Sequence, residues 1–145
     1  MTPAIVVRRT EQTLEEWRPG VTTRRIVSAA TGSATICVME QRHEPGRGAP
    51  THRHDTEEVV IVRDGEAEFR VEGERVRLEA GDAIVLPADV RHGFVNTGSR
   101  ELVVEAVFSS AAPSVTYEEE AGLELEIGAA ATTHRTPRAR SAEPA

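Results

Sequence analysis

The stretch GRGAPTHRHDTEEVVIVRDG, residues 46–65, contains two histidines, His52 and His54, that are separated by one residue. On a β-strand, residues two apart lie on the same face, with Cα atoms about 6.6 Å apart. Two imidazoles at this spacing can bind one metal ion at about 2.0–2.1 Å each. On a helix the same spacing would point them apart. The spacing therefore predicts a strand that carries two ligands of one ion.

Glu58 lies four residues beyond His54 and has the same parity. On an unbroken strand it would be roughly 13 Å from His54, which is too far to share an ion. Asp55 and Thr56 favour turns, so we expect a bend there that brings Glu58 back on the neighbouring strand. His92, which follows the turn sequence PADVRH, can complete the set from a third strand. The adjacent Glu57 has the opposite parity and is expected to be solvated.

Turn residues recur along most of the chain and separate Val- and Ile-rich runs of four to nine residues. Breaks this regular predict an all-β sandwich or barrel from about residue 21 to residue 127. One short N-terminal helix is expected over residues 10–17, TEQTLEEW, where Thr10 can cap the first turn and Pro19-Gly20 ends the helix. Residues 1–128 are interpreted as one domain, and residues 129–145 as a loosely ordered tail.

Composition limits the partners and the compartment. The formal net charge of −7 argues against nucleic acid as a partner. The single cysteine, Cys37, excludes an internal disulfide, fits a reducing compartment and is expected to be a small buried hydrophobic residue. Because no signal peptide or long apolar segment is visible, we expect a cytoplasmic protein without membrane contact.

His43 ends the expected strand ATICVMEQRH, residues 34–43, which presents Cys37, Met39, Gln41 and His43 on one face. If this face lines the cavity, His43 could compete with Glu58 as a fourth metal ligand. It could instead act as a neighbouring acid or base, or lie on the surface just before a Pro-Gly turn. These alternatives stay open at the level of sequence.

The same residues resemble the two motifs of the cupin superfamily. The first motif is matched by Gly46, His52, His54, Glu58 and Gly65, and the second by Gly81, Pro87, His92 and Asn96, with Asp89 at a usual glycine position. Fifteen residues separate Gly65 from Gly81, as in small single-domain bacterial cupins. The resemblance implies a double-stranded β-helix (jelly-roll) barrel that holds one divalent metal through His52, His54, Glu58 and His92. It also implies a homodimer, with residues 5–7 and 123–127 as candidate pairing strands.

A six-coordinate ion with four protein ligands keeps two positions for substrate or water. We expect a cavity lined by aliphatic residues, Met39 and Phe94, which favours a small, neutral, apolar ligand that bears oxygen atoms. Within the superfamily the chain most resembles the cupin-type aromatic polyketide cyclases, such as the resistomycin-type cyclase.

That resemblance implies a metal-dependent aldol-type ring closure of a poly-β-ketone intermediate in aromatic polyketide (antibiotic) biosynthesis. Zn²⁺ is the first choice of metal, and Glu58, His43 or a metal-bound water would act as the base. One alternative is a dioxygenase that uses Fe²⁺, Mn²⁺, Ni²⁺ or Cu²⁺ on a phenolic or β-diketone substrate. The other alternative is a cupin that binds a small molecule without turnover.

Overall fold

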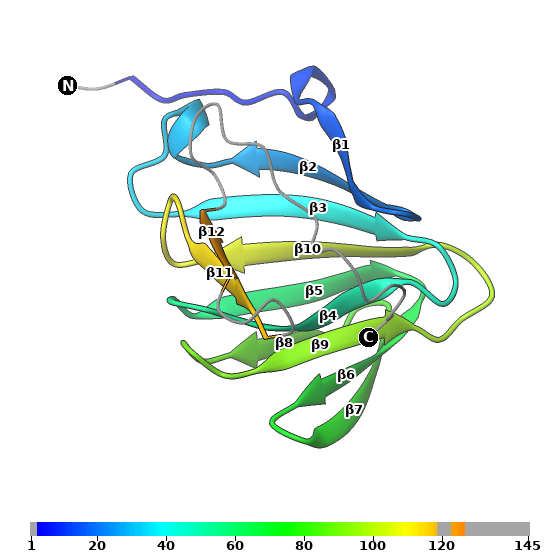
Figure 1. The fold of residues 1–145 in the computed structure, drawn as a ribbon. Helices are drawn as coiled ribbons and strands as arrows, with labels where there is room; N and C mark the ends of the chain where they lie inside the picture. The colour runs from blue at the N-terminus through cyan, green and yellow to red at the C-terminus, as the bar shows by residue number, and fades with distance from the viewer. Residues whose placement is uncertain (1–2, 119–122, 127–145) are drawn as a thin grey trace.

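The computed structural model describes residues 3–118 and 123–126, which form two six-stranded antiparallel sheets (Figure 1). The strands are β1 (Leu14–Arg18), β2 (Val21–Val27), β3 (Cys37–His43), β4 (Gly48–His54), β5 (Glu58–Asp64), β6 (Glu66–Val71), β7 (Glu74–Glu79), β8 (Ala83–Leu86), β9 (His92–Asn96), β10 (Leu102–Phe108), β11 (Ser114–Tyr117) and β12 (Leu123–Glu126). The first sheet has the order β1-β2-β3-β10-β5-β8 and the second has the order β12-β11-β4-β9-β6-β7. This all-β jelly roll confirms the expected fold class.

The expected helix over residues 10–17 is wrong. Only a single 3₁₀ turn, η1 (Arg9–Glu11), forms there, and Leu14–Arg18 is a strand paired with β2. The side chain of Trp17 is buried in an apolar cluster, and Gly20 with a φ of 77° turns the chain directly into β2. Tertiary packing of the tryptophan thus outweighs the weak local preference for helix. A second 3₁₀ turn, η2 (Ala29–Thr31), follows β2.

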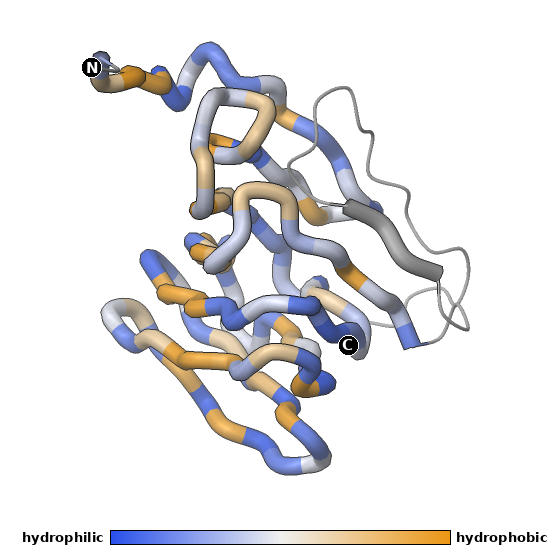
Figure 2. The backbone as a smooth tube through the Cα atoms, turned by 90° about the vertical axis from the view of Figure 1, so that its left-hand side faces the viewer, coloured by the Kyte–Doolittle hydropathy of each residue, from blue (hydrophilic) through white to orange (hydrophobic). Residues whose placement is uncertain are grey.

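The core consists of two apolar clusters. Phe69 and Phe94 stack in one of them, at 4.8 Å between ring centroids, and Trp17 and Phe108 belong to the other. Hydrophobic and hydrophilic segments alternate along the strands (Figure 2), as expected for strands with one face turned to the core. Cys37 is fully buried, and burial raises the pKa of its thiol to about 12, so it is a small hydrophobic residue, as predicted.

The turns predicted from the two motifs have the backbone angles that such turns need. Gly46, Gly65 and Gly81 have φ values of 83°, 88° and 99°. Asp89, at the position where the second motif usually has glycine, has a φ of 67°. Aspartate tolerates this left-handed conformation better than most residues, so the departure from the motif leaves the turn intact.

A β-bulge in β4 positions the first histidine. Gly48 pairs with Val95 and Ala49 with Phe94, but the next recorded pair is His52 with His92, so β4 holds one extra residue. A bulge of this kind redirects side chains beside functional sites. Here it places two imidazoles, one from β4 and one from β9, directly opposite each other.

Within the described residues, no helix is long and apolar enough to cross a membrane. Ile5 and Val6 are exposed, and β12 lies at the edge of its sheet. The homodimer that these segments could build stays a prediction, as does the single-domain boundary. Residues 129–145, expected to form a loose tail, lie outside the described residues.

The close approach of β4 to β9 leads to a stability prediction. A Cβ atom added to Gly48 would lie 1.9 Å from the carbonyl oxygen of Phe94. We therefore expect Gly48→Ala to reduce the free energy of unfolding by about 1–3 kcal/mol, the usual cost of overpacking, as measured by urea denaturation. Gly98→Ala is the matched control, because the three atoms nearest to its added Cβ all belong to side chains, those of Glu66 from 3.1 Å and Asn96 at 3.5 Å. Equal stability of the two variants would contradict the close approach of β4 to β9 at Gly48.

Candidate metal centre

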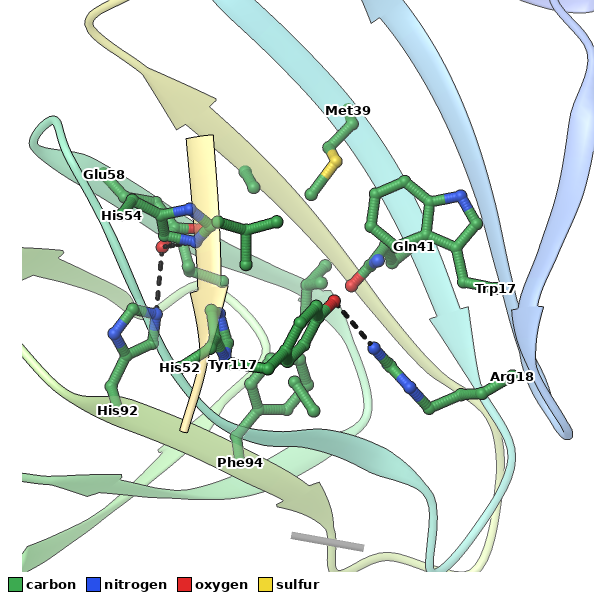
Figure 3. A pocket seen from close by; sticks show the side chains of 15 residues that line it. Trp17, Arg18, Met39, Gln41, His52, His54, Glu58, His92, Phe94 and Tyr117 are labelled. Carbon is green, nitrogen blue, oxygen red and sulfur yellow. Dashed lines mark hydrogen bonds and ion pairs between the residues drawn. The ribbon is translucent and has the colours of Figure 1, made fainter. Parts of the chain in front are cut away.

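Three buried imidazoles converge between the sheets. His52 and His54 come from β4 and His92 comes from β9, and their candidate ligand atoms all lie within 4.8 Å of one another. Figure 3 shows the three rings around one end of a cavity. The expectation that His52 and His54 share a strand face, with His92 arriving from another strand, agrees with this geometry.

The backbone fixes the orientation of each ring. The Nδ1 atom of His52 lies 2.6 Å from the carbonyl oxygen of Pro50. The Nδ1 atoms of His54 and His92 lie 2.8 Å and 2.9 Å from the carbonyl oxygens of Ser114 and Val90. A carbonyl oxygen can only accept, so each Nδ1 carries the proton and donates it. In a neutral ring, Nε2 is then left with a lone pair, as in histidines that bind metal.

Glu58 joins the three histidines from β5. The chain bends after His54, and β5 begins at Glu58 itself. The Oε1 atom of Glu58 lies 3.4 Å from Nε2 of His54 and 3.1 Å from Nε2 of His92, an ion pair drawn in Figure 3. Oε1 is nevertheless buried without a well-aligned hydrogen bond. A buried carboxylate oxygen in this position has a free lone pair aimed at the imidazoles.

The pKa shifts of His52, His54 and Glu58 suit a metal, whereas the shift of His92 favours the protonated ring, whose proton a metal has to displace. Burial lowers the pKa of His52 well below its ordinary value, and the charges of His92 and His54 lower it further. Burial also lowers the pKa of His54. The pKa of His92 is raised, because the contact with Glu58 outweighs burial. Burial raises the pKa of Glu58, but His54 and His92 outweigh this effect and keep the pKa below its usual value.

This donor set fits a divalent metal ion. Neutral imidazole nitrogens and a carboxylate oxygen are ligands of zinc, and also of iron, manganese, nickel and copper. The orphaned Oε1 of Glu58 is the observation that tests the fit, since a cation at the centre of the group would satisfy it. A metal held by His52, His54 and His92 with Glu58 as fourth ligand is therefore our proposal for this site. The donor set does not select one metal.

The structure does not bring His43 into this group. His43 lies on β3 in the other sheet, fully buried, with its ring edge on Phe94 at 4.9 Å between centroids. Its Nε2 lies 3.2 Å from Oε1 of Gln41. The predicted strand face is correct, because Met39 and Gln41 line the cavity, but His43 itself falls beyond that lining. His43 therefore contacts Gln41 and lies outside the group of imidazoles around Glu58.

The cavity beside the imidazoles is narrow and more polar than expected. Its free volume is about 30 Å³, and it is lined by the four site residues, by apolar side chains such as Met39 and Phe94, and by Trp17, Arg18, Gln41 and Tyr117 (Figure 3). Sequence reasoning missed Tyr117, and it missed Trp17 and Arg18 because the segment before Pro19 is interpreted as a helix. The Pro19-Gly20 hairpin turn that joins β1 to β2 is the signal that could have placed them.

Comparison with known proteins agrees with this geometry. Residues 39–108, which include all four site residues, match the cupin domain family. The chain carries a cupin domain. The polyketide synthase CurC of Streptomyces cyaneus is 33% identical over 88 residues, which are 60% of this chain and 54% of CurC. The acireductone dioxygenase of Emericella nidulans is 36% identical over 62 residues, 39% of this chain and 35% of that protein. This chain therefore spans about half of CurC and about a third of the dioxygenase.

Solved structures show the same cupin fold. The polyketide cyclase RemF from Streptomyces resistomycificus superposes with a TM-score of 0.61 at 23% identity, over 74% of this chain and 79% of that one. KdgF from Halomonas gives a TM-score of 0.63 at 23% identity, over 74% of this chain and 94% of that one. At these identities the likeness establishes the fold alone. Cupin domains occur in enzymes of several kinds, so the chemistry has to be argued from the site.

Buried His43 leads to a prediction about pH. Burial lowers its pKa from 6.5 to about 3, so the folded protein keeps it neutral at pH values where the unfolded chain protonates it. Stability from this group is complete above pH 6.5 and falls as the pH drops below that value. The free energy of unfolding of metal-free protein falls between pH 6.5 and pH 5. We expect this fall to be smaller in His43→Gln than in the wild type, by on the order of 2 kcal/mol. Urea denaturation at both pH values measures this difference, and an unchanged pH slope in the variant would contradict it.

Proposed function

We propose that this protein is a metal-dependent polyketide cyclase that closes a ring in a poly-β-ketone intermediate by aldol condensation and dehydration. The observation that carries the proposal is the convergence of three imidazoles and the buried Glu58 carboxylate at one end of a largely apolar cavity. Backbone carbonyl oxygens hold each of the three imidazoles in its orientation. The similarity to the polyketide synthase CurC over 88 residues supports this choice of chemistry.

A divalent ion held by His52, His54 and His92 would supply a Lewis acid that polarises a ketone and makes the neighbouring methylene group more acidic. Glu58 is ionised at neutral pH, because its pKa is held low by His54 and His92. Oε1 is the atom that faces the metal position, so the second carboxylate oxygen of Glu58 is the one that can accept the methylene proton, and the new carbon–carbon bond then forms to a second carbonyl carbon of the same chain. The protonated carboxyl gives that proton to the alkoxide oxygen, which becomes a hydroxyl group. The carboxylate then removes the second proton of the same carbon and returns it to the hydroxyl group as it leaves as water.

The walls of the cavity also contribute to the rate of ring closure. Apolar side chains, among them Met39, Val60 and Phe94, enclose the space beside Glu58 and exclude water from it. A flexible ketone chain confined there has far fewer conformations than in solution, and the two reacting carbons meet more often. The wall thereby selects which ring is formed.

A metal-dependent dioxygenase is the second candidate, and the size of the cavity favours it. Holding one water needs roughly 10–15 Å³ of such volume, so about 30 Å³ holds only a few atoms. A phenol or small β-diketone would require less movement of the walls than a poly-β-ketone. The gentisate 1,2 dioxygenase 1 of Aquipseudomonas alcaligenes is 37% identical over 60 residues, 41% of this chain and 17% of that protein.

Oxygen consumption separates the two reactions. A ring closure by condensation and dehydration uses no dioxygen, whereas a dioxygenase uses one molecule per turnover. We expect the zinc-loaded protein to convert a poly-β-ketone mimic to a cyclised, dehydrated product under argon, as followed by mass spectrometry. Product formation only with Fe²⁺ or another redox metal, together with stoichiometric oxygen uptake, would overturn the cyclase and establish the dioxygenase.

Glu58 and its neighbour form a matched pair for testing the base. Glu58 is buried against the imidazoles, whereas Glu57 is exposed. We expect Glu58→Gln to lower turnover by roughly 10²–10⁴-fold, the usual contribution of a general base, and Glu57→Gln to leave it unchanged. Metal content measured on the same samples shows whether the loss comes from the metal or from the base. Full turnover in folded Glu58→Gln protein would remove Glu58 from the mechanism.

A further inference from the structure

Two consecutive residues at the end of β1 both face the cavity. Residues next to each other on a regular strand point to opposite faces, yet Trp17 and Arg18 both line the cavity wall. The pairing of β1 with β2 explains this, because Glu16 pairs with Thr22 and Arg18 with Val21, which leaves Trp17 as an extra residue. This second β-bulge turns Arg18 towards the cavity that His52, placed by the bulge in β4, also lines.

Arg18 has only neutral partners in the part of the chain that the structure describes. Its guanidinium donates one hydrogen bond to the carbonyl oxygen of Gly48, at 3.1 Å, and one to the hydroxyl oxygen of Tyr117, at 3.2 Å. Three of its five N–H donors are left over. Of the thirteen other arginines in the described residues, eight are paired with a carboxylate, namely Arg9, Arg25, Arg42, Arg63, Arg75, Arg77, Arg91 and Arg100.

Among the described residues, the lining offers no second carboxylate to balance this charge. Glu58 is the only acidic residue among the lining residues, and it is already in contact with His54 and His92. The positive charge of Arg18 reaches the cavity lining: burial raises the pKa of Tyr117, and the charge of Arg18 and its hydrogen bond oppose that rise. A half-buried guanidinium without a counter-charge is costly unless an anion from outside pairs with it.

Tyr117 connects the two polar ends of the cavity. Its ring lies 5.7 Å from the ring of His52, between centroids, and its hydroxyl oxygen contacts Arg18. In Figure 3 the phenol stands between the imidazoles on one side and Arg18 on the other. One small molecule that reaches along Tyr117 would therefore contact the metal centre and Arg18 at the same time, once the walls of the cavity move apart to admit it.

We propose that Arg18 binds an anionic oxygen of the substrate, so that the substrate is an acid, a carboxylate or an ionised enol, with metal-chelating oxygens at its other end. The planar guanidinium suits such a group, because it offers parallel N–H donors to two oxygens. The inference rests on the proposed function for the metal end of the substrate. It replaces the neutral ligand that we expected from the sequence with an acidic one.

The experiment compares acids with neutral molecules of the same shape. Metal-free protein, prepared with a chelator, is titrated by isothermal calorimetry with salicylate and with salicylamide. It is also titrated with 4-hydroxy-6-methyl-2-pyrone, an acidic enol without a carboxylate, and with its 4-methoxy ether, which cannot ionise. Trp17, the only tryptophan of the chain, lines the cavity, so its fluorescence reports whether a probe binds there.

We expect wild-type protein to bind the acid of at least one pair about tenfold or more tightly than its neutral partner, as a charge-assisted hydrogen bond provides. Arg18→Gln should bring the ratio of the two affinities close to one, and Arg18→Lys should keep part of it. Tyr117→Phe, which removes only the hydroxyl that orients Arg18, should lower the ratio to an intermediate value. Arg63→Gln, at an exposed ion pair with Glu105, is the control and should leave the ratio unchanged.

A preference for salicylate alone assigns a carboxylate substrate, and a preference for the pyrone assigns an ionised enol. No preference in either pair, or a preference that persists in folded Arg18→Gln protein, would overturn the proposal. Metal content is measured in parallel and separates the two proposals. Normal metal binding without acid preference means that only the Arg18 inference fails, whereas acid preference without metal binding means that the proposed function fails.

Discussion

The site depends on three backbone carbonyl oxygens, those of Pro50, Ser114 and Val90, each of which holds the Nδ1 atom of one histidine. This interaction selects the tautomer, and the tautomer decides that Nε2 faces the centre of the group. A free imidazole would divide its population between two tautomers and many ring orientations. The carbonyls remove that freedom before any metal arrives, so a cation meets ligands that are already oriented.

Irregular positions in the two sheets bring the site residues together. A bulge in β4 sets His52 opposite His92, and a bend after His54 returns Glu58 on the neighbouring sheet. A second bulge, in β1, adds Arg18 to the other end of the same cavity. Regular strands would have alternated these side chains between core and solvent. The irregular positions in the ladders are therefore where the sequence departs from simple alternation to build a site.

Much of this site follows from the sequence because the two-residue spacing of His52 and His54 and the turn residues around them are local signals. The strand face that carries Met39 and Gln41 was predictable for the same reason. His43 was not, because whether the last residue of that face reaches the cavity depends on how β3 lies against the opposite sheet. The position of Arg18 was harder to predict, since burial of Trp17 decides that residues 14–18 form a strand.

One cavity thus has two polar ends, a metal centre built on imidazoles and an arginine without a counter-charge among the described residues. The metal centre depends on how the imidazoles are oriented, and long-range ¹H–¹⁵N NMR correlations of the histidine side chains test this orientation most directly. In metal-free protein, His52 and His54 should be neutral rings protonated on Nδ1, and added Zn²⁺ should shift the Nε2 resonances of His52, His54 and His92 while leaving those of His43 in place. Protonation of His52 and His54 on Nε2, or a zinc response at His43 in place of His92, would contradict it.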